Sequence, residues 1–146
     1  MKKSLSVSIL GSTGSIGVNC LDVIRRFPDD YHVTALAAGR NVELLAGQIT
    51  EFRPRLAAVL DQRLAADLEN LLGPGNGVEI VCNDAGFERA ASLDEVHIVV
   101  SAMVGAAGLK PTWAAVRSGK RVALANKETI DRKSTRLNSS HGKLAR

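Results

Sequence analysis

The chain lacks the features that would place it outside the ordinary globular proteins. No run of about 18 apolar residues occurs in its 146 residues, so no membrane span is predicted. Hydrophobic residues make up 45% and charged residues 23%, which is typical of a single globular domain and excludes a disordered, collagenous or coiled-coil chain. The start, Met1-Lys2-Lys3, imitates a signal peptide. The stretch behind it is short and runs into glycines, which favours a strand and a cytoplasmic protein.

Cysteine and histidine are also scarce. Cys20 and Cys82 are far apart with no Cys-x-x-Cys, and the three histidines are isolated from them and from one another. A zinc site is therefore not indicated, and no other metal ligands stand out. We expect two small buried thiols in a reduced compartment.

Aromatic residues are few, and the positive charge has a local origin. The net charge of +4 comes from residues 131–146, which hold five basic residues and one acid, so residues 1–130 are neutral. A nucleic-acid-binding body needs a basic face of its own, and base stacking needs aromatic platforms. With aromatics at 3% of the chain, nucleic-acid binding is not predicted.

Apolar segments of two periods alternate along the chain. Six strands are predicted at 5–10, 32–38, 56–60, 78–81, 96–101 and 121–124. Helices are predicted at 16–27, 41–52, 61–72, 84–93 and 109–118, with 105–108 a loop. Ile16, Cys20, Val23 and Phe27 are predicted to form the apolar stripe of the first helix, and Trp113 to serve packing. Strands alternating with helices predict an α/β fold, a doubly wound, mostly parallel Rossmann-type sheet.

A glycine-rich segment, residues 11–17 (GSTGSIG), separates the first strand from the first helix. Gly11 and Gly14 permit a tight turn and a close approach of a pyrophosphate to the backbone. The helix N-terminus then supplies free N–H groups and a positive dipole end. Thr13 and Ser15 add hydroxyl donors. The spacing is not that of a P-loop, and a turn without a ligand is the alternative.

The second strand ends in Gly39-Arg40-Asn41. In this fold that tip meets the adenosine ribose, where an acidic residue favours NAD. Arginine there suits the 2′-phosphate of NADP, and no acid lies between His32 and Val42. A solvated surface arginine is the alternative.

Two further segments follow strands at the edge where ligands bind in such sheets. Residues 101–108 are small and suit either a cofactor or close helix–sheet packing. Asn126, Lys127 and Glu128 follow the last strand and could hold a ribose, a substrate anion and a cofactor amide. A helix cap with a surface Lys/Glu pair is the alternative.

Together these segments resemble one family, the NADPH-binding domain of 1-deoxy-D-xylulose 5-phosphate reductoisomerase. The resemblance covers roughly residues 4–130 and rests on segments 9–17, 21–23, 38–41, 104–112 and 124–128. It implies an enzyme of isoprenoid precursor biosynthesis. That enzyme rearranges 1-deoxy-D-xylulose 5-phosphate and reduces the product with NADPH to 2-C-methyl-D-erythritol 4-phosphate.

The resemblance also implies site residues. The pyrophosphate and ribose region would be held by Thr13, Gly14, Ser15 and Ile16, next to Gly11. The 2′-phosphate end would be held by Gly39, Arg40 and Asn41. Asn126 and Glu128 would contact the cofactor, and Lys127 the phosphosugar substrate. A divalent metal (Mg, Mn or Co) and a homodimer are implied for the full-length enzyme. Its metal-binding acids, lid and C-terminal domain would lie beyond this chain, so no complete catalytic set is expected here.

Residues 131–146 depart from the family pattern, so residues 1–130 are predicted to be the cofactor domain and 131–146 a basic tail, disordered or foreign. We hypothesise a truncated gene read into unrelated sequence. A native stop codon after this same tail in the source locus would contradict that hypothesis. Two other functions stay open: a non-enzymatic NADP-binding sensor, and a semialdehyde-type reductase with a cysteine nucleophile, for which Cys82 has no basic neighbour in sequence.

Overall fold

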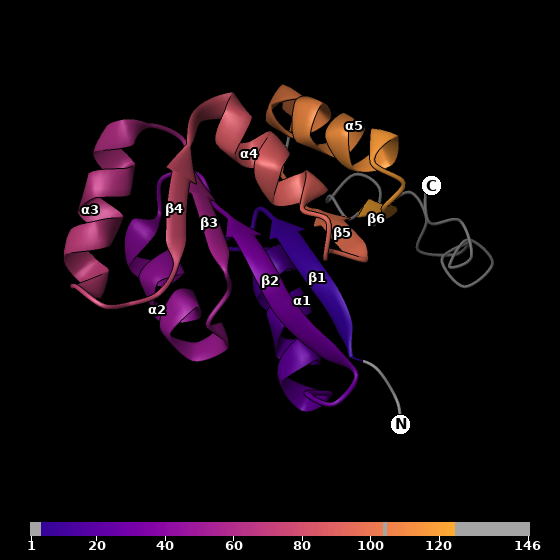
Figure 1. Cartoon of the computed structure of the whole chain (residues 1–146), viewed down its shortest axis with the longest axis horizontal. Coiled ribbons are helices and arrows are strands. Elements are labelled where there is room, and N and C mark those ends of the chain that lie inside the picture. Colours follow the sequence, from indigo (N-terminus) through magenta and orange to yellow (C-terminus); the bar gives the residue numbers. More distant parts are fainter. Residues whose placement is uncertain (1–3, 104, 125–146) are drawn as a thin grey trace.

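The computed structural model describes residues 4–103 and 105–124, which form a parallel sheet flanked by helices (Figure 1). The six strands lie in the order β4-β3-β2-β1-β5-β6, and every neighbouring pair is parallel. Their bounds are β1 Leu5–Leu10, β2 Tyr31–Ala37, β3 Leu56–Val59, β4 Glu79–Cys82, β5 Ile98–Ser101 and β6 Arg121–Leu124.

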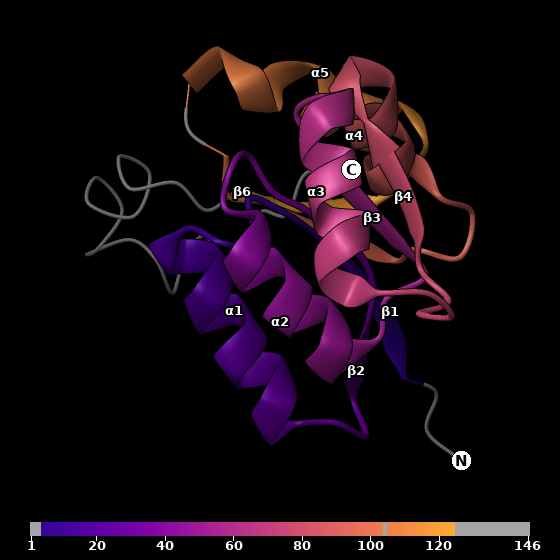
Figure 2. The same cartoon turned by 90° about the vertical axis from the view of Figure 1, so that its left-hand side faces the viewer.

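Helices connect successive strands and cover both faces of the sheet (Figure 2). Their bounds are α1 Ser15–Arg26, α2 Val42–Phe52, α3 Gln62–Leu72, α4 Asn83–Ser92 and α5 Leu109–Arg117, with a 3₁₀ turn at Gly105–Gly108. Side chains of α1, α2 and α3 share one apolar cluster, and those of α4 and α5 the other. The longest of the described helices has 12 residues, and none of them is long and apolar enough to cross a bilayer.

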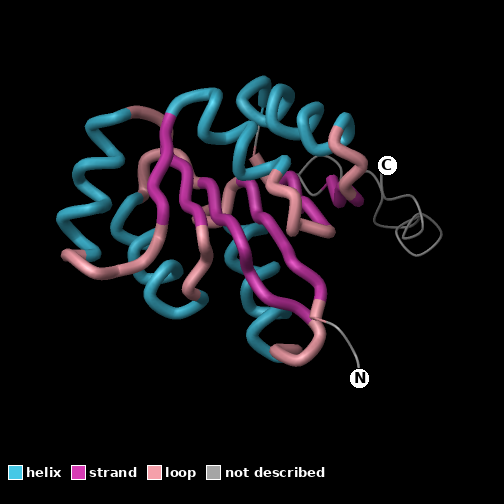
Figure 3. The backbone as a smooth tube through the Cα atoms, viewed as in Figure 1, coloured by secondary structure: helices cyan, strands magenta, loops and turns pink. Residues whose placement is uncertain are grey.

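The direction of winding reverses beside β1. From β1 the chain moves outward through β2, β3 and β4, and then crosses by α4 to β5 on the other side of β1. In open sheets of this kind, ligands bind beyond the carboxyl ends of the strands at the point of reversal. That point lies between β1 and β5, whose ends pair Leu10 with Ser101. The helix and strand course is traced in Figure 3.

The core follows the alternation of the strands. In β1, Val7 and Ile9 face the α1–α3 layer, while Leu10 faces the α4–α5 layer. Ser8 points to the second layer, where its hydroxyl donates to the carbonyl oxygen of Ala90 at 2.8 Å. The buried hydroxyl is therefore paired, as burial of a polar group requires.

The predicted elements are confirmed, with ends that differ by one or two residues, and the sheet is wholly parallel. Three details were wrong. The 105–108 segment is a 3₁₀ turn. The buried face of α1 carries Gly17, Leu21 and Ile24, whereas Val23 and Phe27 are about half exposed. The helix is turned so that Gly17 meets the glycine loop, and that contact sets which residues face inward.

The third detail is Trp113, which does not serve packing among the described residues. Its side chain is 61% exposed on α5, close in sequence to Leu109, which is 69% exposed. The face of α5 that packs on the sheet carries smaller residues, Pro111 and Ala115.

Candidate cofactor site

The glycine-rich loop sits where the sheet predicts a ligand, between β1 and α1. Gly11 has a φ of +92°, and a Cβ there would lie 2.9 Å from the backbone carbonyl of Ala102, which follows β5. A Cβ on Gly17 would lie 2.2 Å from the Gly11 carbonyl oxygen. These two glycines therefore let the loop, α1 and the end of β5 approach one another closely.

Gly14 is different, because it is exposed and has room around it. It is the N-cap of α1 with a φ of −77°, and a Cβ there would meet only the Gly11 oxygen at 3.7 Å. No side chain caps the helix, and its first turn contains no acid. The N–H groups of a first helical turn have no partner within the helix, so this end of α1 can accept an anion. Thr13 and Ile16 are partly exposed beside it, and Ser15 is exposed.

Hydrogen bonds from the end of β2 and from α2 hold the glycine-rich loop in place. The N–H groups of Gly11 and Ser12 both donate to the carbonyl oxygen of Ala37 at the end of β2, at 2.7 and 3.0 Å. The side-chain amide of Gln48, on α2, donates to the carbonyl oxygen of Ser12 at 2.9 Å. Nothing in the sequence around Gln48 indicated this contact, since the two residues are 36 positions apart.

The tip of β2 lies next to this loop and leads into α2. Gly39 is followed by Arg40, whose side chain is exposed. Asn41 caps α2: its Oδ1 accepts from the Leu44 N–H at 3.1 Å. A Cβ on Gly39 would have no atom within 4 Å, so the tip offers open space for a ligand.

Two carboxylates that the sequence did not point to share the surroundings of Arg40. A surface hollow there is lined by Arg40, Asn41, Val42, Glu43, Asp67, Asn70 and Leu71. Glu43 lies directly after Val42, where the acid-free stretch that begins at His32 ends, so the sequence beside Arg40 does contain an acid. Asp67 comes from α3, so only the packing of α3 beside α2 brings it here.

The segment after β5 is used in part for packing. The hydroxyls of Ser101 and Thr112 lie 2.6 Å apart and join β5 to α5. A Cβ on Gly108 would lie 3.3 Å from that of Met103, a close approach. Ser101 pairs with Leu124, so β6 ends at the same edge of the sheet. Asn126, Lys127 and Glu128 lie outside the described residues.

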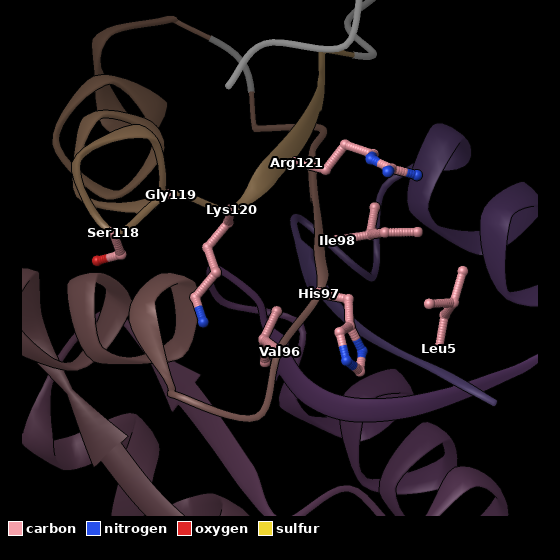
Figure 4. Close-up of a pocket in the computed structure, with 8 residues that line it drawn as sticks. All are labelled: Leu5, Val96, His97, Ile98, Ser118, Gly119, Lys120 and Arg121. Carbon is pink, nitrogen blue, oxygen red and sulfur yellow. The ribbon is translucent and has the colours of Figure 1, made fainter. Parts of the chain in front are cut away.

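Figure 4 shows a pocket whose lining shares no residue with this site. It is found at the amino ends of β1, β5 and β6 and is lined by Leu5, Val96, His97, Ile98, Ser118, Gly119, Lys120 and Arg121. Two of its polar side chains, His97 and Lys120, already make hydrogen bonds within the fold. The Ser6 N–H donates to His97 Nδ1 at 2.9 Å, and Lys120 Nζ donates to the Asp94 carbonyl at 3.1 Å. Because the candidate cofactor site lies at the carboxyl ends of the strands, this pocket lies at the opposite edge of the sheet.

Other charged groups and one thiol of the described residues lie outside the candidate site. Arg25 on α1 reaches both Glu51 on α2 and Asp22, and this bonding holds the pKa of the Glu51 carboxyl below its usual range. Burial raises the pKa of the Cys20 thiol. The ranges 4–103 and 105–124 contain no group of three or more His, Cys, Asp or Glu side chains that could hold a metal ion.

The sheet order, the reversal beside β1 and the uncapped glycine turn that opens α1 define a Rossmann-type domain, the architecture on which many proteins bind dinucleotides. Residues 7–131 match the profile of the 1-deoxy-D-xylulose 5-phosphate reductoisomerase family, and the chain belongs to that family. The resemblance read from the motifs is thereby confirmed. The family assignment also decides against the semialdehyde-type reductase that the sequence left open.

Curated relatives carry the same family name. The chain is 51% identical to the 1-deoxy-D-xylulose 5-phosphate reductoisomerase of Chlorobaculum tepidum over 125 residues, 86% of this chain and 32% of that protein. It is 51% identical to that of Geotalea uraniireducens over 130 residues, 89% of this chain and 33% of that protein. The chain thus spans about a third of the length of the curated relatives it matches.

Solved structures that bear the same family name also resemble this chain. The reductoisomerase of Zymomonas mobilis in complex with NADPH matches with a TM-score of 0.80 and 38% identity, over 97% of this chain and 37% of that one. A DOX-P reductoisomerase in complex with NADPH, fosmidomycin and magnesium matches with a TM-score of 0.80 and 36% identity, over 96% of this chain and 34% of that one.

Proposed function

We propose that this chain binds NADPH, as the cofactor domain of an enzyme that converts 1-deoxy-D-xylulose 5-phosphate to 2-C-methyl-D-erythritol 4-phosphate. The observation that carries the proposal is the open, uncapped N-terminus of α1 behind Gly14, at the point where the sheet reverses. Family membership and the NADPH complexes of two related structures support it.

The pyrophosphate would lie against Thr13, Gly14, Ser15 and Ile16. The first-turn N–H groups and the dipole of α1 stabilise negative charge there, and Gly14 leaves the space that two phosphates need. Gly11 shapes the turn beneath them. NADPH, when bound, supplies a hydride for the reduction.

The 2′-phosphate would lie at Gly39, Arg40 and Asn41. A guanidinium recognises a phosphate by paired, charge-assisted hydrogen bonds. Glu43 and Asp67 share this hollow, so the formal charge of its lining is −1 and Arg40 is its one cation. Selectivity for the phosphate would therefore rest on Arg40. Lys127 would contact the phosphosugar, and Asn126 and Glu128 the cofactor.

The remaining parts of the proposal concern the whole enzyme. The described residues contain no cluster that fits a divalent metal, so Mg, Mn or Co would be held by other residues of the enzyme. The match to the family profile stops at residue 131, which supports a boundary near residue 130 between the cofactor domain and residues 131–146. A homodimer, a cytoplasmic location and the absence of nucleic-acid binding stay part of this proposal.

A titration tests the cofactor assignment. NADPH and NADH are titrated into the chain, and we expect tighter binding of NADPH. Arg40→Glu should lower that selectivity about tenfold, which is about 1.4 kcal/mol. Arg26→Glu is the matched control, because it makes the same charge change on an exposed residue at the far end of α1. Equal NADPH curves for Arg40→Glu and the unaltered chain would refute the assignment.

A further inference from the structure

A polar side chain lies on the buried face of α2, where an apolar one is expected. Gln48 is 7% exposed and sits between Leu45 and Ile49, which are buried and apolar. A buried amide costs stability unless both of its ends are hydrogen-bonded. Its Nε2 donates to the Ser12 carbonyl, but its Oε1 has no partner among the described residues. Among the described residues, the bond to Ser12 is the one hydrogen bond that the Gln48 side chain makes.

The partner of Gln48 lies in the loop that would meet the pyrophosphate. Ser12 is fully buried, and its own hydroxyl also has no partner among the described residues. The side chain of Ser12 therefore does not hold the loop in place. The Ser12 N–H donates to the Ala37 carbonyl, and the Ser12 carbonyl accepts from Gln48, so hydrogen bonds fix both peptide groups around Ser12.

The hydrogen bond to the Ser12 carbonyl also sets the direction of the next backbone N–H group, that of Thr13. In a trans peptide the N–H points opposite to the C=O, and no cis peptide is found among the described residues. The Ser12 carbonyl points toward α2, so the Thr13 N–H of the same peptide points away from α2. Thr13 is partly exposed and precedes Gly14, the open cap of α1.

We propose that Gln48 is a positioning residue for the cofactor, which holds the Ser12–Thr13 peptide so that the Thr13 N–H faces the pyrophosphate. This inference rests on the proposed function. Gln48 also lies on the helix that Asn41 caps, so one rigid element links the loop to the Gly39–Asn41 tip. The contact would set the loop before the cofactor arrives and lower the cost of ordering it.

The test uses Gln48→Met, which keeps the length of the side chain and removes the donor. NADPH affinity should fall about tenfold, the loss of one well-placed hydrogen bond to a charged group. Adenosine 2′-monophosphate, which has no pyrophosphate, should bind within about twofold of the unaltered chain. Thr50→Val is the matched control, because it removes another side-chain bond to a carbonyl on α2, from Thr50 to Ala46 at 3.0 Å. It should leave both affinities unchanged.

Two readouts separate the possible outcomes. Hydrogen exchange of the 11–17 amides should be faster in Gln48→Met than in the unaltered chain, whether or not NADPH binds. If the unaltered chain fails to bind NADPH, the proposed function fails, and the exchange rates still decide whether Gln48 holds the loop. Unchanged NADPH affinity in a folded Gln48→Met would overturn the inference. So would equal losses for both ligands with a lowered unfolding midpoint, since that marks a purely structural residue.

A measurement on the unaltered chain covers the case in which Gln48→Met does not fold. A through-bond NMR coupling between the Gln48 side-chain amide and the Ser12 carbonyl carbon, kept when NADPH is added, supports the inference. Loss of that coupling on NADPH binding would overturn it, because the contact would then be absent from the complex.

Discussion

Two glycines of one loop should respond to substitution in opposite ways. Gly14 is exposed at the cap of α1, and a Cβ there meets only one atom, at 3.7 Å. Gly17 is buried, and its Cβ would lie 2.2 Å from the Gly11 oxygen and 2.6 Å from the Ser12 Cα. We therefore expect Gly14→Val to weaken cofactor binding strongly with the fold kept, and Gly17→Ala to weaken the fold.

The magnitudes follow from these contacts. Gly17→Ala meets backbone on two sides, which no side-chain rotation relieves, so the overlap costs about 3 kcal/mol. Alanine regains about 1 kcal/mol as the better helix former, which leaves a net loss of about 2 kcal/mol. At this chain length the unfolding midpoint should fall by roughly 5–8 °C. Gly14→Val exchanges a good N-cap residue for a poor one, a cost of about 1 kcal/mol.

The effect of Gly14→Val on binding is larger. Its methyl groups occupy the space in front of the first-turn N–H groups, so the phosphates lose close contact with the end of α1. We expect NADPH affinity to fall about 100-fold, which is about 2.7 kcal/mol. Fluorescence titration of NADPH measures the affinity, and thermal unfolding followed by circular dichroism measures the stability. A folded Gly14→Val with normal affinity would show that the loop is only a turn. A Gly17→Ala that unfolds at the original midpoint would refute the close-packing argument.

Three further predictions concern the whole chain, a thiol and an ion pair. The 146-residue chain should show no substrate-dependent NADPH oxidation with saturating 1-deoxy-D-xylulose 5-phosphate and divalent metal, because its described residues contain no metal-binding cluster. Oxidation above background in a preparation free of host enzyme would contradict this. Cys20 should be alkylated at pH 8 more slowly in the folded chain than in the urea-unfolded chain, because burial raises the pKa of its thiol. Mass spectrometry measures the two alkylation rates, and equal rates would count against that burial. The bond from Arg25 lowers the pKa of Glu51, so its contribution is present above the ordinary glutamate pKa of 4.5 and is lost as the pH falls through the lowered value. The thermal unfolding midpoints of Arg25→Met and the unaltered chain should therefore differ slightly at pH 7 and converge in acid. A difference that persists at low pH would argue against a contribution from the Arg25–Glu51 pair.

Much of the fold was readable from local patterns. The spacing of apolar residues predicted each described strand and α-helix in order. The glycine loop and the arginine at the tip of β2 indicate a dinucleotide site from short sequence segments alone. These features depend on residues that are near one another in sequence, so the sequence alone carries them.

The tertiary structure decided what depends on distant neighbours. Whether Val23 or Leu21 faces the core depends on how α1 is rotated, and the contact of Gly17 with the loop sets that rotation. Asp67 reaches the hollow of Arg40 only because α3 packs beside α2. The bond from Gln48 to the glycine loop joins residues 36 positions apart. No local periodicity encodes such a pair, because its partners meet only when the α1–α3 layer closes over the sheet.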